Sequence, residues 1–346
     1  MKKYTKYFFL FLSLFIFVGC EIFNFVLTER KENIVTKEAS GFVLNSTSKT
    51  ISLFGLNTGK VYNSFISLAN TSTAIKFALV NDDIWVAATA TGTIKRYKSS
   101  GLSQSEPLKI IFLEDSSAPN SILISKGFAY VTGNNSNKVF RVDLATDSVK
   151  SVAVGSNPQG MAIDENSNKL YIANSNWSGA TDKNGDTLKS ISVIDLNDFD
   201  KGSEIVKIPK KGAQTITIVG NHIYVVCSFF GQTNSYVVKL NKNKKIVSLI
   251  EMNISSNEIV FWKDYLYLNK GYNNNGLVFF HKDSTVVHYK DLAYSIVSMD
   301  AKSNYFAMAV KNLDGSYSAK IFLDNLDSTP LSVTIGQWPS CIKIKE

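Results

Sequence analysis

The fold is decided by three stretches of one repeat: Asn-Pro-Gln-Gly-Met-Ala-Ile-Asp at 157–164, Asn-Lys-Leu-Tyr-Ile-Ala-Asn-Ser at 168–175 and Lys-Ser-Ile-Ser-Val-Ile-Asp-Leu at 189–196. Each stretch carries a short apolar run, and a turn-rich gap follows each run. The runs contain β-branched and aromatic residues, and the third one alternates with a period of two. These features predict consecutive strands of one sheet.

Copies of this pattern fill most of the chain. An aromatic residue inside a β-branched run marks each copy, at Phe42, Trp85, Tyr130, Tyr171, Tyr224, Tyr267 and Phe306. An apolar inner strand is expected before six of them, at 74–80, 121–124, 160–163, 214–219, 258–261 and 295–299. The spacing of about 43 residues is typical of a propeller or a solenoid.

The inner strand that the first copy lacks is expected at the other end of the chain. Gln-Trp-Pro-Ser-Cys-Ile-Lys-Ile at 337–344 matches the stretch that begins at Asn157. Pairing of the two ends would remove the unpaired sheet edges of an open array. The sequence therefore predicts an all-β fold over residues 41–346. It is a seven-bladed β-propeller of four-stranded blades, in which the C-terminal strand completes blade one.

Two copies also carry a family resemblance. Tyr-Val-Thr-Gly-Asn at 130–134 and Tyr-Ile-Ala-Asn-Ser at 171–175 resemble the YVTN-repeat β-propellers of prokaryotic secreted and surface proteins. The resemblance is clear over residues 119–200 and rests on pattern alone elsewhere. It implies a seven-bladed ring outside the cytoplasm and no single activity.

The first residues predict a targeting segment. Three lysines within the first six residues precede an apolar stretch at 7–18, as in secretory signal peptides. Phe-Val-Gly-Cys at 17–20 resembles the lipobox of bacterial lipoproteins, in which the cysteine is acylated. We expect a signal peptide at 1–19, a lipidated Cys20 and a tether to residue 40. An uncleaved membrane anchor is the alternative.

A lipid on Cys20 would place the protein at the bacterial cell envelope, with the lipid as its contact with the membrane. In the enterobacterial sorting rule, Asp after the acylated cysteine retains a lipoprotein at the inner membrane. Glu21 therefore favours the outer membrane, on its periplasmic or surface face.

The charge and the histidines argue against two classes of function. The formal net charge of +8 includes the three lysines of the signal peptide, and the other basic residues are spread evenly, so no nucleic-acid partner is expected. His222, His281 and His288 are expected at the surface, and Glu258 is a single carboxylate near the ligand-binding face. No catalytic residue is assigned. A periplasmic enzyme such as a metal-dependent lactonase is the alternative, and a nucleic-acid-binding propeller is a weaker one.

Cysteines and a blade-four insertion complete the chemistry. Cys227 and Cys341 lie in blades too far apart for a disulfide, and we expect two buried thiols. Asp182, Asn184 and Asp186 resemble the first half of a calcium loop. The same residues are also a good turn sequence without metal. No cofactor is expected, apart from calcium in this loop.

The last prediction is a partner site on a monomeric domain. Loops between second and third strands, and loops that enter inner strands, open on one face of a propeller. They carry amides, which offer donors and acceptors, and aromatic rings, which anchor interfaces. The residues are Asn134, Gln159, Asn176, Trp177, Phe229, Phe230, Tyr272, Asn274 and Trp338, with Asn120 beside them. They suit an envelope protein, an extended peptide or a glycan, although asparagine is also common in tight turns.

Overall fold

The computed structural model describes residues 39–68, 73–101, 103–185, 187–229, 232–271 and 274–345. The predicted signal peptide, Cys20 and nearly all of the tether lie outside these residues. Apart from two short 3-10 helices, the regular structure of the described residues is β-strand. None of the helices in this part of the chain has the length and apolar character needed to cross a membrane.

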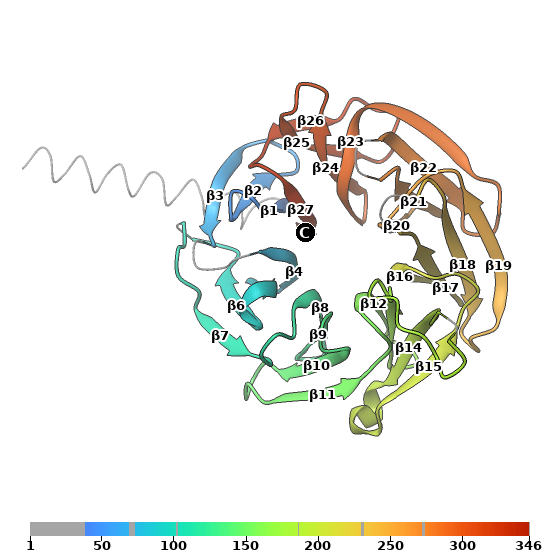
Figure 1. Ribbon diagram of the computed structural model, residues 1–346. Helices are drawn as coiled ribbons and strands as arrows, with labels where there is room; N and C mark the ends of the chain where they lie inside the picture. The colour runs from blue at the N-terminus through green and yellow to red at the C-terminus, as the bar shows by residue number, and fades with distance from the viewer. Residues whose placement is uncertain are drawn as a thin grey trace, which may run out of the picture.

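The strands form six antiparallel sheets around a ring (Figure 1). Each of the first five sheets has four strands. From the inner strand outward, the first sheet contains β27 (Pro339–Lys345), β1 (Ser40–Asn45), β2 (Thr50–Gly55) and β3 (Val61–Ser67), and the second contains β4 (Ala74–Val80), β5 (Asp83–Ala88), β6 (Thr93–Lys98) and β7 (Lys109–Phe112). The third contains β8 (Pro119–Ser125), β9 (Phe128–Gly133), β10 (Lys138–Asp143) and β11 (Val149–Ala153), and the fourth contains β12 (Pro158–Asp164), β13 (Lys169–Asn174), β14 (Ser190–Asp195) and β15 (Ser203–Lys207). The fifth contains β16 (Ala213–Val219), β17 (His222–Cys227), β18 (Ser235–Asn241) and β19 (Ile246–Met252).

The sixth sheet has seven strands because one long strand serves two units. Its strands are β20 (Ile259–Trp262), β21 (Tyr265–Asn269), β22 (Asn275–His281), β23 (His288–Lys302), β24 (Tyr305–Asn312), β25 (Tyr317–Leu323) and β26 (Leu331–Thr334). The first part of β23 pairs with β22, and the second part pairs with β24. We number the four-stranded units blades 1 to 7 in chain order, with β23 shared by blades 6 and 7. The predicted all-β propeller class is confirmed.

The last strand is the inner strand of the first blade. β27 pairs antiparallel with β1, with Ser40 opposite Lys345 and Asn45 opposite Pro339. The matching motif at 337–344 pointed to this pairing, since its proline and apolar residues repeat those of β12.

The core lies between neighbouring blades. The aromatic residues that mark the repeats are buried, and each packs against residues of the next blade or the one before. Tyr171 of blade 4, for example, shares a cluster with Ile216 and Val225 of blade 5. Burying such large side chains at each junction is the main stabilising contribution that the repeats make.

A common backbone geometry begins the inner strands. The pairing register shifts near the start of β4, β8, β12 and β16, so these strands carry bulges that re-aim the next side chains. The residue before five inner strands has a positive φ, at Thr73 (58°), Ala118 (50°), Asn157 (52°), Gly212 (78°) and Trp338 (52°). Residues with unrelated side chains share this positive φ. The conformation is therefore a feature of the repeated blade fold and not of a particular ligand site.

Candidate functional site

The candidate site is a cavity of about 560 Å³ at the centre of the ring. Residues of all seven inner strands line it, and its volume lies within the usual range for small-ligand sites. We call it the central cavity. Its lining divides into a neutral half, from blades 3 to 5, and a charged half, from blades 6, 7, 1 and 2.

Four carboxamides line the central cavity where inner strands begin. Asn120, Gln159 and Gln214 are the second residues of β8, β12 and β16, and Asn257 lies two residues before β20. We call these four residues the amide arc. Asn120, Gln159 and Gln214 each lie at a register shift near the start of their strand, and such bulges re-aim the neighbouring side chains.

Two members of the amide arc have their full hydrogen-bonding capacity available. Within the described part of the chain, the side chains of Asn120 and Gln159 make no hydrogen bond. Gln214 donates from Nε2 to the Ser228 carbonyl at 3.1 Å, and Asn257 Oδ1 accepts from Asn269 at 2.8 Å. The amide donors and acceptors that these two contacts leave open can form hydrogen bonds with a bound molecule.

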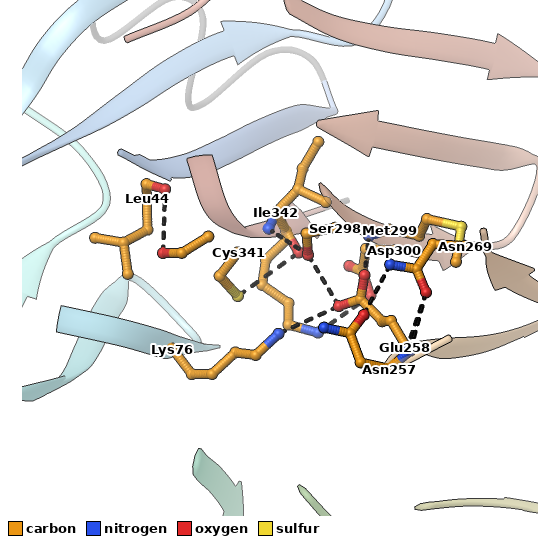
Figure 2. A network of polar contacts seen from close by, with 12 residues as sticks. Leu44, Lys76, Asn257, Glu258, Asn269, Ser298, Met299, Asp300, Cys341 and Ile342 are labelled. Atoms are coloured by element: carbon orange, nitrogen blue, oxygen red, sulfur yellow. Dashed lines mark hydrogen bonds and ion pairs between the residues drawn. The ribbon is translucent and has the colours of Figure 1, made fainter. Parts of the chain in front are cut away.

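The charged half contains two ion pairs. Lys76 Nζ lies 3.2 Å from Glu258 Oε1, and this pair joins blade 2 to blade 6 (Figure 2). Lys343 Nζ lies 3.3 Å from Asp300 Oδ1 and joins blade 1 to blade 7. One pair therefore links the neighbouring blades 1 and 7, and the other links blades 2 and 6, which lie on either side of them.

Further donors fix the two carboxylates in place. Glu258 accepts the Ser298 hydroxyl at 3.0 Å and the Met299 backbone N–H at 2.8 Å (Figure 2). Asp300 accepts the Ile344 N–H at 2.8 Å. Such charge-assisted bonds are stronger than neutral ones. Both carboxylates are thus structural supports of the cavity wall.

Electrostatics keep both lysines protonated. Burial lowers the pKa of Lys76, but the nearby Glu258 carboxylate outweighs that effect, and the net pKa is raised. The Asp300 carboxylate raises the pKa of Lys343 despite burial. Neither amine is therefore available as a base or a nucleophile near neutral pH.

The structure gives Asn134 and Asn176 a different environment from the one expected of ligand-binding amides. Both are buried. Asn134 donates to the Pro158 carbonyl at 3.2 Å and accepts the Trp177 indole N–H at 2.9 Å. Asn176 donates to the Ala180 carbonyl at 2.8 Å and accepts the N–H of the same residue at 2.9 Å. These amides shape the loops and hold Trp177 in place.

The other predicted residues lie in several places. Gln159 lines the central cavity. Trp177, Trp338 and Asn274 are exposed on loops, and Phe229 is half-buried with the Lys211 ammonium 4.9 Å from its ring centroid. Phe230 and Tyr272 lie outside the described residues.

The remaining predictions concern metal and thiols. The Asp182 carboxylate accepts the Asn184 N–H at 2.8 Å in a turn, Asp186 lies outside the described residues, and calcium stays a prediction. No group of three His, Cys, Asp or Glu side chains within the described ranges could hold a metal ion. Cys227 and Cys341 are free and buried, as expected.

Sequence reasoning missed most of the charged half of the cavity. Glu258 was noted as a single carboxylate, whereas Lys76 and Lys343 were not singled out. A signal exists for Lys76, because it interrupts an otherwise apolar inner strand, whereas Lys343 lies in a strand that also contains Ser340 and Lys345. Charges on two inner strands of a ring are candidates for pairing across its centre.

Comparisons with known proteins identify the fold. No family model matches the chain, and no curated protein matches it. A putative 6-phosphogluconolactonase from Bacteroides fragilis has a similar structure, with a TM-score of 0.67 and 11% identity over 90% of this chain and 99% of that chain. A putative 6-phosphogluconolactonase from Bacteroides uniformis gives 0.65 and 11% over 90% and 100%.

A quinonprotein alcohol dehydrogenase-like protein from Bacteroides thetaiotaomicron is also similar, with a TM-score of 0.64 and 12% identity over 88% of this chain and 79% of that chain. At such low identities these likenesses show the β-propeller fold alone.

Proposed function

We propose that this protein is a binding module of the bacterial cell envelope, held by a lipid on Cys20, and that its ligand is a polar molecule such as a glycan or an extended peptide. The amide arc of the central cavity carries this proposal. Four amides from neighbouring blades converge on one space, and two of them have no partner within the described residues. Hydroxyl and peptide groups are the ligands that such amides match. The stretches Tyr-Val-Thr-Gly-Asn at 130–134 and Tyr-Ile-Ala-Asn-Ser at 171–175 fit membership of the YVTN-repeat family.

Exposed aromatic residues at the same end of the ring support the proposal. Trp338 directly precedes Pro339, where β27 begins. Asn174 pairs with Pro158, so Trp177 lies at the end where β12 begins. Indole rings beside a polar cavity provide flat faces for sugar rings or peptide side chains.

Binding is better supported than catalysis by the chemistry of the cavity. Glu258 and Asp300 are paired and hydrogen-bonded, and both lysines stay protonated. A metal-dependent lactonase would need these carboxylates to leave their lysines before they could bind a metal. The amide arc, in contrast, needs no rearrangement.

Binding measurements on the full chain in detergent test the proposal. A panel of soluble glycans and peptides would be titrated against wild type, and the same ligands against Asn120→Ala/Gln159→Ala. We expect a ligand that loses at least tenfold in affinity in the double variant. Asn166→Ala changes an exposed amide in the turn between β12 and β13, outside the cavity; it is the control and should bind as wild type does. Equal affinity of wild type and the double variant for every ligand would refute the proposal.

The anchor and the calcium loop have separate tests. Cells fed a palmitate analogue should label wild type and leave Cys20→Ser unlabelled; label on the variant would exclude lipidation at Cys20. Fractionation should recover the protein with outer-membrane markers. Calorimetry with millimolar calcium should give heat if the Asp182 loop binds the ion, and its absence would remove calcium from the proposal.

A further inference from the structure

The two lysines of the central cavity have donors to spare. An ammonium group has three N–H donors. Among the described residues, Lys76 contacts one acceptor, Glu258, and Lys343 contacts one acceptor, Asp300. Each lysine therefore keeps as many as two N–H groups for a molecule in the cavity.

Exposure shows which charges face the cavity. The side chains of Lys76 and Lys343 are 34% and 39% exposed, whereas those of Glu258 and Asp300 are 14% and 21% exposed. The carboxylates are turned towards Ser298 and the backbone N–H groups that hold them. The accessible part of the charged half is thus mainly cationic, although its formal charges balance.

The lysines belong to neighbouring blades and lie near one another. Lys343 is the fifth residue of β27 and Lys76 the third residue of β4, an offset of two residues, or roughly 7 Å along the strands. Their charges are close enough to interact, since Lys343 lowers the pKa of Lys76 and so opposes the effect of Glu258. An anion beside both ammonium groups would relieve this repulsion.

We infer that Lys76 and Lys343 form a subsite for a single carboxylate, and that the ligand of the central cavity is an acidic saccharide. The inference rests on the proposed function, because the amide arc would bind the neutral hydroxyl groups of the same molecule. The lining holds two lysines and two carboxylates. A monoanion therefore suits the cavity better than a doubly charged phosphate, which would add more repulsion from Glu258 and Asp300. The opposite wall contains the amides of Asn120, Gln159 and Gln214 and several hydroxyl groups beside its apolar residues, which favours a saccharide over an apolar acid.

The test compares D-glucuronate with D-glucose, which differ at one carboxylate. Binding to the full chain in detergent would be measured by ligand-observed NMR at moderate salt. We expect wild type to prefer glucuronate at least tenfold. Lys76→Met and Lys343→Met should bring the ratio close to one, whereas Lys126→Met, an exposed lysine in a surface ion pair, should keep it. If Lys76→Met folds poorly because Glu258 is left unpaired, Lys76→Met/Glu258→Gln removes both charges of the pair. This double variant should also lose the preference for glucuronate.

The outcomes separate the inference from the proposed function. Equal binding of the two sugars by wild type would overturn the carboxylate subsite and leave the amide arc standing. A preference that survives in both lysine variants would also overturn it. Displacement of glucuronate by an equal concentration of inorganic phosphate would refute the selectivity for a single negative charge. Asn120→Ala/Gln159→Ala should weaken both sugars equally, and binding of neither sugar by wild type would count against the cavity as a saccharide site.

Discussion

Replacing Glu258 by glutamine should destabilise the ring measurably. Glu258 accepts from Lys76 at 3.2 Å, from Ser298 at 3.0 Å and from the Met299 N–H at 2.8 Å. A glutamine has one oxygen where the carboxylate has two. Whichever way its amide turns, the NH₂ group faces either the Met299 N–H or both the Lys76 ammonium and the Ser298 hydroxyl, and at least one donor loses its acceptor.

The expected loss follows from the contacts. A hydrogen bond to a charged group contributes about 1.5–3 kcal/mol. Water reaches the partly exposed Lys76 and offsets some of its lost attraction, so we expect a loss of about 2 kcal/mol. A domain of roughly 300 residues unfolds with an entropy near 0.6 kcal/mol per degree, which converts this loss into a Tm about 3 °C lower.

Thermal unfolding followed by circular dichroism measures the effect. Glu165→Gln is the matched control, because Glu165 forms an exposed ion pair with Lys126 and should change Tm by less than about 1 °C. Adding Lys76→Met to Glu258→Gln should recover part of the loss, since no unpaired charge then remains. A Glu258→Gln protein that melts within 1 °C of wild type would show that the ion pair contributes little to stability.

Three further predictions concern packing, reactivity and pH. A Cβ added at Gly160 would lie 2.9 Å from the Thr215 Cα, a backbone atom that cannot move aside, so Gly160→Ala should cost about 1–3 kcal/mol; unchanged urea unfolding would contradict this. Burial raises the pKa of the Cys227 thiol to about 12, so iodoacetamide at about pH 8 should alkylate it only after unfolding, and native-state alkylation seen by mass spectrometry would disprove the burial. Burial opposes ionisation of Asp164, but Lys242 and other donors outweigh it and lower its pKa in the folded protein. The resulting stability is present above the unfolded pKa of about 3.9 and is lost as pH falls through the lower folded value; the Tm of Asp164→Asn should therefore fall less steeply than that of wild type below about pH 4, and parallel curves would exclude the effect.

The strands were predictable because each repeat contains its own signal. The predicted inner strand at 74–80 coincides with β4, and the aromatic residues that mark the repeats are the ones buried between blades. These positions follow from the local alternation of apolar and polar residues and from the repeat spacing along the chain, both of which are visible in the sequence. The continuous β23 was not predicted, since a strand shared by two blades of one sheet has no turn signal to mark the change from one blade to the next.

The site was less predictable, because the role of a polar side chain depends on its surroundings. Asn134 and Gln159 look alike in the sequence, as amides next to strand ends. The Pro158 carbonyl and the Trp177 indole of the next blade are the partners of Asn134, whereas Gln159 faces an open cavity. Lys343 alternates with two isoleucines, as in any half-exposed strand, and only the position of β27 as the inner strand of blade 1 shows that Lys343 lines the central cavity.

The pairing of β27 with β1 also determines at which rim of the ring the chain enters the first blade. Pro339 and the amide arc lie where the inner strands begin, whereas Ser40 pairs with Lys345 at the opposite rim. A protein held by a lipid ahead of Ser40 is therefore tied by one rim and presents the other. In that arrangement the beginnings of the inner strands, which carry the amide arc, would lie at the rim opposite the one where the chain enters the ring.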